Sequence, residues 1–551
     1  MADLNKKPLN IVMFPWLAFG HIIPFLELSK CLAQRGHKIS FISTPRNLQR
    51  LPKIPSDISH QYTLVTLPLP ENVNLPEHAE ATTDCPHDKI QYLKVAFDGL
   101  SLPFAQYLET CDASPDWIIH DFAHHWLPPI AAKFGIPCAY LSVFNASSMT
   151  FYGPPAVLMG EDGGSRSLPE HFTVPPPWVP FPSDIVFRPF EANKAFDIVE
   201  NASGVSDSFR FGCVLKNTDA VFVRSCTGFE GEWFELLKNV VYKKPVIQMG
   251  SLLPPLPSEE EEKNEAWVVI KQWLEKQKEG SVVYVALGSE ASLTQQGMHE
   301  LATGLESSNL PFFWVIRKPL GSTQEDYFNT MLPSGFKDRV KGRGILWKGW
   351  VPQLRILSHI SVGGFLTHCG WGSTTEGLGL GKLLLLLPML YDQGLVARLV
   401  HSRKIGLEIP RDERDGSFTR ESVTESLRIL MLGEESEKFK IKAREMKELF
   451  TDMERQNGYI DDLERFMIDY GNGKSNASSA VINTTEPETA FTDDVECHLK
   501  EDMDAKIDGT ATNIITSKFE KIDVSVNANA NSNITKSPTV NNGLLKQLET
   551  A

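Results

Sequence analysis

Short apolar runs alternate with longer amphipathic stretches from the start of the chain. Residues 9–15 form an apolar run, a loop passes through Gly20 and His21, a helical pattern covers 22–34, and a second apolar run covers 38–43. This order predicts a strand, a helix and a parallel strand at the beginning of the chain. The first loop lacks the spaced glycines GxGxxG, so a dinucleotide-binding domain of the dehydrogenase kind is not indicated.

The same alternation restarts in the second half of the chain. A Pro-rich segment at 250–257 and an acidic run at 259–262 separate the halves. We interpret residues 251–265, which contain both, as an interdomain linker. An apolar strand pattern at 282–287 and a helical pattern from about residue 295 follow. This alternation predicts a second domain built on a parallel sheet.

Five parts are therefore expected along the chain. They are a first α/β domain, the linker, a second α/β domain, a C-terminal helix and a tail, at residues 1–250, 251–265, 266–453, 454–470 and 471–551. The last 81 residues contain ten Asn, two Phe and no Trp or Tyr. Such a segment buries too little apolar area to offset its ordering entropy, so we expect a disordered tail.

Charge and composition exclude several classes of partner. The chain has 69 acidic and 54 basic residues and a formal net charge of −15, which leaves no electrostatic footprint for nucleic acid. The longest apolar stretch, 383–390, is about half as long as a membrane span. No secretory signal is read, and the eight cysteines include no CxxC pair. We expect a cytoplasmic monomer with no nucleic-acid partner and no membrane span.

The most informative segment is 350–393, WVPQLRILSHISVGGFLTHCGWGSTTEGLGLGKLLLLLPMLYDQ. Within it, an apolar strand at 363–367 leads through a turn into a helical run that begins at Trp371. The free amides at a helix N-terminus form a binding site for a pyrophosphate. Glu376 lies three residues after Ser373 on the same helix face, where a carboxylate can accept hydrogen bonds from the hydroxyls of a ribose.

This segment resembles the C-terminal signature box of the plant secondary-product UDP-glycosyltransferases. It matches that box in its length of 44 residues and in the anchors W.PQ, LSH, G.F.THCGW, S..E, P and DQ. Together with the N-terminal half, the resemblance covers roughly residues 8–470. It implies an α/β chain of the GT-B fold, in which two Rossmann-like parallel-sheet domains face a cleft. The first domain would bind the acceptor and the second the UDP-sugar.

The resemblance also implies the residues that bind the donor. By motif match, Trp350 and Gln353 would contact uridine, His368 and Ser373 the phosphates, Glu376 the ribose, and Trp371, Asp392 and Gln393 the transferred sugar. Val351 and Gly372 are also predicted to belong to the donor site. Ser289, after Gly288, resembles the loop that closes over the diphosphate. Two departures stand out: Gly372 replaces the usual Asn, and Gly381-Lys382-Leu383 replaces Gly-Val-Pro.

A catalytic pair is implied by two further motifs. FPWLAFGHIIPFLELSK places His21 where the family has its general base, and HDFAHHWLPPIA places Asp121 where it has the carboxylate that orients this base. A hydrogen-bonded Asp fixes the tautomer of such a base and stabilises its imidazolium. The neighbouring His120, His124 and His125 are interpreted as pocket residues; a metal site is their alternative, although they lack a convincing carboxylate or Cys partner.

The expected function is an inverting transfer of glucose or rhamnose from a UDP-sugar to a hydroxyl of a plant small molecule. Neither a metal nor a cofactor beyond the donor substrate is expected. The acceptor would be a flavonoid, terpenoid or steroid, including an existing glycoside. Phe144, Phe151, Tyr152 and Trp178 are candidates for its wall, and Asn145 for a contact to the donor sugar.

Other function classes stay open at this stage. A UDP-sugar-binding protein would keep the donor site without the chemistry, and the presence of His21 and Asp121 argues against it. A UDP-sugar epimerase of similar architecture would form product without an added acceptor. A hydrolase is disfavoured because no G-x-S-x-G motif occurs.

Overall fold

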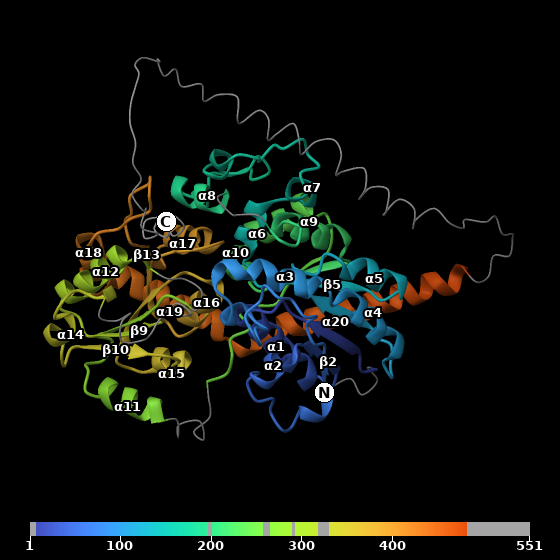
Figure 1. Cartoon of the computed structure of the whole chain (residues 1–551), viewed down its shortest axis with the longest axis horizontal. Helices are drawn as coiled ribbons and strands as arrows, with labels where there is room; N and C mark the ends of the chain where they lie inside the picture. The colour runs from blue at the N-terminus through green and yellow to red at the C-terminus, as the bar shows by residue number, and fades with distance from the viewer. Residues whose placement is uncertain (1–6, 197–200, 257–264, 289–292, 318–329, 482–551) are drawn as a thin grey trace, which may run out of the picture. The chain divides into compact units, whose positions relative to one another are not determined.

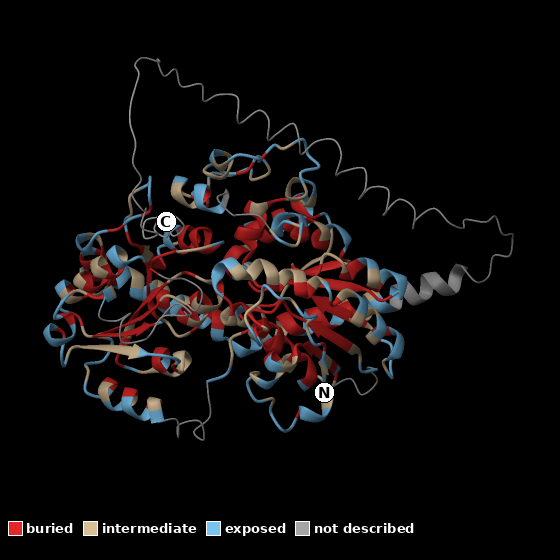
Figure 2. Cartoon of the chain, in the orientation of Figure 1, coloured by how far each residue is buried: buried red, intermediate tan, exposed pale blue. Residues whose placement is uncertain are grey.

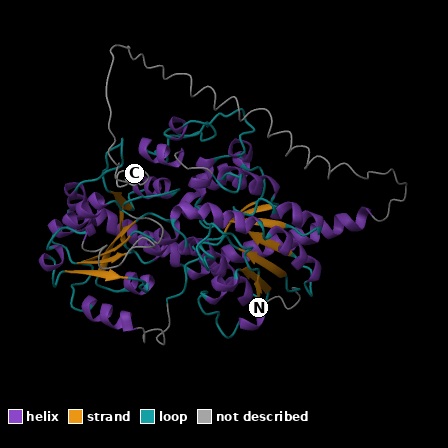
Figure 3. Cartoon of the chain, in the orientation of Figure 1, coloured by secondary structure: helices purple, strands orange, loops and turns teal. Residues whose placement is uncertain are grey.

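The computed structural model describes residues 7–196, 201–256, 265–288, 293–317 and 330–481. Its strands form two groups, each with helices around it (Figure 3). Both sheets are entirely parallel, as the alternation of strand and helix patterns predicts. Their central strands are buried, whereas strands at the sheet edges are partly exposed (Figure 2). Ser289 and the predicted tail from residue 482 onward lie outside the described residues.

The first sheet has seven strands in the order β3-β2-β1-β4-β5-β6-β7. These are β1 (Asn10–Phe14), β2 (Lys38–Ser43), β3 (Tyr62–Thr66), β4 (Trp117–His120), β5 (Cys138–Ser142), β6 (Ala220–Val223) and β7 (Val246–Gln248). Its helices are α1 (Phe19–Gln34), α2 (Pro45–Gln49), α3 (Ile90–Asp98), α4 (Ser101–Thr110), α5 (Leu127–Lys133), α6 (Ala146–Tyr152), α7 (Pro155–Leu158), α8 (Pro189–Phe196), α9 (Asp207–Asn217) and α10 (Thr227–Leu236) (Figure 1).

The second sheet has six strands in the order β10-β9-β8-β11-β12-β13. These are β8 (Val282–Ala286), β9 (Phe312–Ile316), β10 (Gly344–Lys348), β11 (Val362–Thr367), β12 (Leu383–Leu386) and β13 (Gly406–Glu408). Its helices are α11 (Glu265–Leu274), α12 (Gln295–Ser308), α14 (Phe336–Arg339), α15 (Gln353–Ser358), α16 (Trp371–Gly379), α17 (Gln393–Ser402), α18 (Arg420–Met431) and α19 (Ser436–Thr451).

The strand order of each sheet reverses beside its first strand. In the first sheet, β1 lies between β2 and β4, and in the second, β8 lies between β9 and β11. Ligands of open α/β sheets bind beyond the carboxyl ends of the strands at such a switch point. His21 and Asp121 follow β1 and β4, and Gly288 and His368 follow β8 and β11. The predicted site residues therefore lie at the switch points of both sheets.

The last helix returns to the first sheet. This helix, α20 (Met453–Val481), buries Ile460, Leu463 and Met467 in the apolar cluster of the first sheet. The indole nitrogen of Trp117 in β4 donates to the carbonyl of Met467 at 3.0 Å. The sequence pattern predicts a final helix at 454–470, and the structure continues it to Val481. None of the described helices has the length and apolar content of a membrane span.

His21 lies in the first turn of α1, so the prediction that it lies in a loop before the helix is wrong. α1 begins at Phe19, whereas the helical pattern of the sequence begins at residue 22. The pattern starts late because Gly20 and Pro24 are poor helix formers. The burial of Phe25 and other apolar residues of α1 against the first sheet stabilises the helix in spite of both.

Candidate active site

The donor signature folds as a strand, a tight turn and a helix. β11 is buried between β8 and β12, and its last residue, Thr367, is followed by a turn in which Cys369 has a φ of 68°. Gly370 caps helix α16, which begins at Trp371. The first amides of a helix have no acceptor within the helix and lie at the positive end of its dipole. This end of α16 can therefore bind a diphosphate.

Three residues of the signature meet beside this helix. The side-chain amide nitrogen of Gln353 donates to the Glu376 carboxylate at 2.7 Å and to the hydroxyl of Ser373 at 3.2 Å. Its carbonyl oxygen accepts a hydrogen bond from the Tyr284 hydroxyl at 3.1 Å. Burial raises the pKa of Glu376, while Gln353 and then Arg224 lower it. The structure thus brings the candidates for uridine, ribose and phosphate contacts into one hydrogen-bonded group.

His368 is enclosed by two glycines. A Cβ on Gly288 would lie 2.7 Å from the Nε2 atom of His368, and a Cβ on Gly370 would lie 2.6 Å from it. Both positions therefore need glycine for the close approach of the imidazole. Burial, with the charge of Arg317, lowers the pKa of His368 to about 4. In the protein without donor the ring is neutral, so it can offer an N–H group to a diphosphate.

Trp371 is anchored to the first half of the chain. Its indole nitrogen donates to the carbonyl of Arg224 at 2.5 Å, and its ring stacks on Phe229 at 5.8 Å between centroids. Only 3% of the residue is exposed. Its indole N–H is thus already occupied by a backbone carbonyl, and Trp371 joins α16 to the residues that follow β6.

Asp392 and Gln393 lie where α17 begins. The side-chain carbonyl of Gln393 accepts from the amides of Met389 and Leu390 at 3.0 and 2.9 Å, which fixes the preceding loop. Asp392 is buried, and its Oδ2 atom has no hydrogen-bond partner among the described residues. Burial raises its pKa to about 7, although its own backbone amide and His21 lower it. An unpaired buried carboxyl can bind hydroxyl groups of a sugar.

The catalytic candidates of the first half are in direct contact. The Nδ1 atom of His21 lies 2.8 Å from Oδ2 of Asp121, and the Asp121 side chain is fully buried. The same carboxylate accepts from the amides of Trp16 at 3.1 Å and Phe122 at 2.7 Å. The His21 side chain is 16% exposed, so one edge of its ring can reach a substrate. This arrangement fits a base whose second nitrogen is held by a fixed carboxylate.

Charges from both halves of the chain meet at this pair. The charge of His21 lowers the pKa of Asp392, while burial and then the Asp392 carboxylate raise the pKa of Tyr152. Burial and then Asp121 raise the pKa of Tyr140, to which Asp392 contributes less. The sugar-binding candidate of the second half and the base candidate of the first are therefore within electrostatic reach of each other. This proximity is the geometric condition for transferring a group between a donor and an acceptor.

The neighbouring histidines are built into the core. His120 and His124 have no exposed surface, and burial lowers the pKa of His120 to about 4 and that of His124 well below its ordinary value. His125 contacts a guanidinium nitrogen of Arg210 at 3.0 Å. Among the described residues no cluster of three or more His, Cys, Asp or Glu side chains is arranged to hold a metal ion. The rings shape the surroundings of Asp121.

The acceptor-wall candidates differ in burial, because Phe151 is buried whereas Phe144, Tyr152 and Trp178 are half-buried. Phe144 and Tyr152 are 6.1 Å apart between ring centroids, and the charge of Asp392 reaches Tyr152. Phe151 is buried against Phe187 at 5.2 Å. Trp178 donates its indole N–H to the carbonyl of Thr150 at 2.7 Å, as a structural residue does.

Asn145 is held by a buried carboxylate. Its amide nitrogen donates to Glu230 and to the Ser147 hydroxyl, both at 2.8 Å. Its side-chain carbonyl is buried and has no hydrogen-bond partner among the described residues. That oxygen remains available as an acceptor for a hydroxyl group of a bound sugar.

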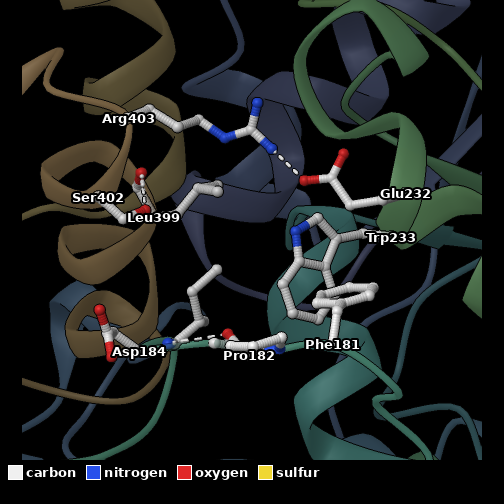
Figure 4. Close-up of a pocket in the computed structure, with 10 residues that line it drawn as sticks. Phe181, Pro182, Asp184, Glu232, Trp233, Leu399, Ser402 and Arg403 are labelled. Carbon is white, nitrogen blue, oxygen red and sulfur yellow. Dashed lines mark hydrogen bonds and ion pairs between the residues drawn. The ribbon is translucent and has the colours of Figure 1, made fainter.

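The remaining signature residues occupy different environments. Trp350 is 69% exposed, so its ring offers an open face on which a base can stack, whereas Val351 is buried. A separate hollow of about 360 Å³ is lined by Phe181, Trp233 and the ion pair of Glu232 with Arg403, among others (Figure 4). None of the predicted donor or catalytic residues lines it, and of its three charged residues Glu232 and Arg403 neutralise each other while Asp184 leaves one negative charge. We assign no ligand to this hollow.

Sequence reasoning missed two residues that contact the site. Tyr284 donates to Gln353, and Arg224 contacts Thr375 in α16 at 3.1 Å. Arg224 directly follows β6 at the carboxyl edge of the first sheet. A search for polar residues at every strand end would have found Arg224. Tyr284 lies inside the apolar strand β8, where no pattern in the sequence distinguishes it from a core residue.

Comparison with known proteins shows the family of this chain. The family "UDP-glucoronosyl and UDP-glucosyl transferase" matches residues 261–440. The chain is 51% identical to UDP-glycosyltransferase 91C1 of Arabidopsis thaliana over 86% of this chain and all of that protein. It is 41% identical to the soyasaponin III rhamnosyltransferase of Glycine max, over 83% of this chain and 95% of that enzyme.

A solved structure shares the fold. It is that of Phytolacca americana UGT2 with UDP-2fluoro-glucose and pterostilbene, with a TM-score of 0.62 and 23% identity, covering 84% of this chain and all of that one. This likeness and the two parallel sheets identify the GT-B fold. The chain therefore belongs to the plant UDP-glycosyltransferases, enzymes that move a sugar from UDP to small molecules, and within them to the group that includes UDP-glycosyltransferase 91C1.

Proposed function

We propose that this enzyme transfers glucose or rhamnose, with inversion at the anomeric carbon, onto a hydroxyl of a plant flavonoid, terpenoid or steroid, including one that already carries a sugar. The observation that carries this proposal is the pair of His21 and Asp121 beside Asp392. A similar relative that is named for rhamnosyl transfer to soyasaponin III supports rhamnose as a donor sugar and a glycoside as an acceptor.

The proposed reaction is a single displacement. His21 removes the proton from the acceptor hydroxyl while Asp121 stabilises the resulting imidazolium. The acceptor oxygen forms a bond to the anomeric carbon as the bond from that carbon to the UDP oxygen breaks. The amides that begin α16 and the N–H group of His368 stabilise the departing diphosphate. Attack on the face opposite UDP inverts the anomeric configuration.

Roles for the two halves follow from the same site. We propose that residues 1–250 bind the acceptor, that 266–453 bind the donor, and that 251–265 join them. We also propose that the enzyme acts as a cytosolic monomer without nucleic acid. Light scattering of the purified protein should then give the mass of one chain, and a dimer mass would contradict the monomer.

A matrix of donors and acceptors tests the reaction. UDP-glucose, UDP-rhamnose and UDP-xylose are each incubated with aglycones and with monoglycosides, and the products are identified by mass spectrometry. We expect an acceptor-dependent mass gain of one hexose or one deoxyhexose, and NMR of the product should show the inverted anomer.

Three outcomes would contradict the proposal. A changed UDP-sugar in the reaction that contains UDP-glucose alone would indicate an epimerase. Binding of UDP-sugars without turnover of any acceptor in the matrix would indicate a binding protein. Product with the retained anomeric configuration would overturn the single displacement.

A further inference from the structure

Arg224 reaches from the first half of the chain to the start of helix α16. It follows β6, and only 4% of the residue is exposed. Its Nε atom donates to the carbonyl of Ser251 at 2.9 Å. Its Nη2 atom donates to the Thr375 hydroxyl at 3.1 Å and to the carbonyl of Leu252 at 3.4 Å. One side of the guanidinium is therefore fixed by the protein.

The other side faces the first turn of α16. Among the described residues, the Nη1 atom of Arg224 has no hydrogen-bond partner, whereas Nε and Nη2 each have one or more. A Cβ added to Gly372 would lie 3.5 Å from this Nη1 atom. Gly372 is the second residue of α16. Among the described residues, no other atom outside the helix backbone and the two adjacent residues lies within 4 Å of that Cβ position, so Gly372 leaves space open next to the Nη1 atom.

The charge of Arg224 is buried without an adjacent counter-ion. Within the described part of the chain, the guanidinium makes no ion pair shorter than 4 Å. Burial lowers its pKa to about 10, and the more distant Glu376 and Glu27 raise it. A buried cation is costly unless an anion or several hydrogen bonds compensate it. A second unpaired group lies in the same turn, because the Thr374 hydroxyl is buried without a partner.

We propose that Arg224 binds the diphosphate of the UDP-sugar, donating from Nη1 to a phosphate oxygen in the space that Gly372 leaves open. This inference rests on the donor site proposed above and assigns to it a cation from the other half of the chain. A guanidinium forms strong charge-assisted hydrogen bonds with phosphate. Because Arg224 also holds Ser251 and Leu252, a bound diphosphate would connect the two halves through one side chain.

Calorimetric titration with UDP and with uridine tests this assignment. Uridine keeps the base and ribose contacts but lacks both phosphates, so the ratio of the two dissociation constants isolates the phosphate contribution. Arg224→Met and Arg224→Gln remove the charge, and the glutamine can still donate to the carbonyl of Ser251. Arg224→Lys keeps the charge. Arg403→Met, which breaks the ion pair with Glu232, is the matched control.

The expected result is a selective loss of phosphate affinity. In Arg224→Met and Arg224→Gln the dissociation constant for UDP should rise about 10- to 100-fold, the cost of one hydrogen bond to a charged group, while that for uridine stays within about 2-fold. Arg224→Lys should recover most of the preference for UDP, because it restores the cation. Arg403→Met should leave both constants unchanged.

The outcome that overturns the role of Arg224 differs from the outcome that overturns the donor site. If UDP and uridine weaken by the same factor in both neutral variants, Arg224 is a structural residue and the inference is overturned. An unchanged UDP affinity in Arg224→Gln overturns it as well. If the unmodified enzyme binds UDP no more tightly than uridine, no phosphate site exists at α16, and the proposed donor site fails with it.

Discussion

At the scale of single residues, the side chains of the site are held in place before any substrate is bound. The Asp121 carboxylate contacts the amides of Trp16 and Phe122 as well as His21. It therefore cannot rotate away when the imidazole takes a proton. Gln393 fixes the loop before it in the same way through two backbone amides. Preorganised groups of this kind lower the cost of reaching the transition state.

The first prediction concerns the catalytic pair. His21→Ala should lower kcat by about 10²- to 10⁴-fold, because it removes the general base. Asp121→Asn should cause a loss of similar order, since the amide cannot stabilise the imidazolium. The double variant should be about as slow as the slower single variant, because the two residues act as a unit. Steady-state kinetics with a saturating donor measure these effects.

If the fold-loss of kcat in the double variant equals the product of the two single fold-losses, His21 and Asp121 act independently. Phe122→Leu, which keeps the backbone contact to Asp121, is a matched control for general damage near the pair. Its kcat should stay within about 10-fold of the unmodified enzyme, since no proton transfer depends on that ring.

The second prediction concerns Asp392. Burial raises the pKa of this carboxyl to about 7 in the folded protein, above its ordinary value of 3.8. Between these two pH values the Asp392 carboxyl is ionised in the unfolded chain but protonated in the folded protein. The free energy of unfolding therefore falls as the pH rises from about 4 to 7. From pH 5 to pH 8 the unmodified protein should lose on the order of 3 kcal/mol relative to Asp392→Asn. Urea unfolding at both pH values measures the difference.

The exposed Asp57 provides the control for that measurement. The free energy of unfolding of Asp57→Asn should differ from that of the unmodified protein by about the same amount at both pH values. A stability difference for Asp392→Asn that does not vary with pH would mean that the carboxyl is not held protonated in the folded state.

At the scale of elements, helix α20 completes the first sheet. Leu463 and Met467 are fully buried, and the Tyr470 hydroxyl contacts Asp219 at 2.6 Å. Trp117 packs against Tyr470 with 5.2 Å between ring centroids. The first sheet is thus covered by a segment that follows the whole of the second sheet in sequence.

The third prediction tests this cover. Leu463→Ala should lower the free energy of unfolding by about 2–5 kcal/mol, because it removes buried methyl groups and leaves a cavity. The neighbouring Arg465→Ala, whose side chain is largely exposed, should change it by less than about 0.5 kcal/mol. Chemical denaturation of both variants measures these values. Equal effects for the two variants would contradict the packing of α20.

The alternation of strands and helices predicted both parallel sheets, because buried parallel strands are continuous apolar runs that periodicity detects well. The start of α1 was missed because Gly20 and Pro24 interrupt the helical pattern, and only packing on the sheet overrides them. The docking of α20 was not predictable either, since an amphipathic pattern shows that a helix has an apolar face but not which sheet covers it.

The candidate site could be predicted where residues of one chemical role recur at a fixed spacing in the sequence. The signature predicts Gln353, Ser373 and Glu376 as ligands of one nucleotide, and in the structure the Gln353 side chain contacts both of the others. It could not identify Arg224, because a single arginine more than a hundred residues away has no spacing relation to α16. The nearness of Asp392 to His21 also depends on how the two sheets pack, which neither motif encodes.

At the scale of the whole molecule, buried ion pairs join the two halves. Arg398 in α17 contacts Glu191 in α8 and, at 3.2 Å, Glu408 in β13. Arg188 contacts the same Glu408 at 3.2 Å. The side chains of Arg398 and Glu408 are less than a tenth exposed. These pairs lie within one compact unit that contains both sheets.

The fourth prediction concerns this network. Arg398→Met should lower the free energy of unfolding by about 3–5 kcal/mol, because two carboxylates lose the buried cation between them. Arg414→Met, which breaks an exposed pair with Asp412, should have an effect below about 1 kcal/mol. Thermal unfolding monitored by circular dichroism compares the two. A loss for Arg398→Met no larger than for Arg414→Met would contradict a joining role.

The return of α20 to the first sheet has a consequence for biosynthesis. The ribosome makes Trp117 and its neighbours long before it makes Met467. More than half of the chain is therefore translated after β4 and before the helix that covers it is complete. A nascent chain arrested after the second sheet would display this apolar surface to chaperones. A premature stop codon before Leu463 should therefore yield a product that is degraded, even though every proposed catalytic residue has already been translated.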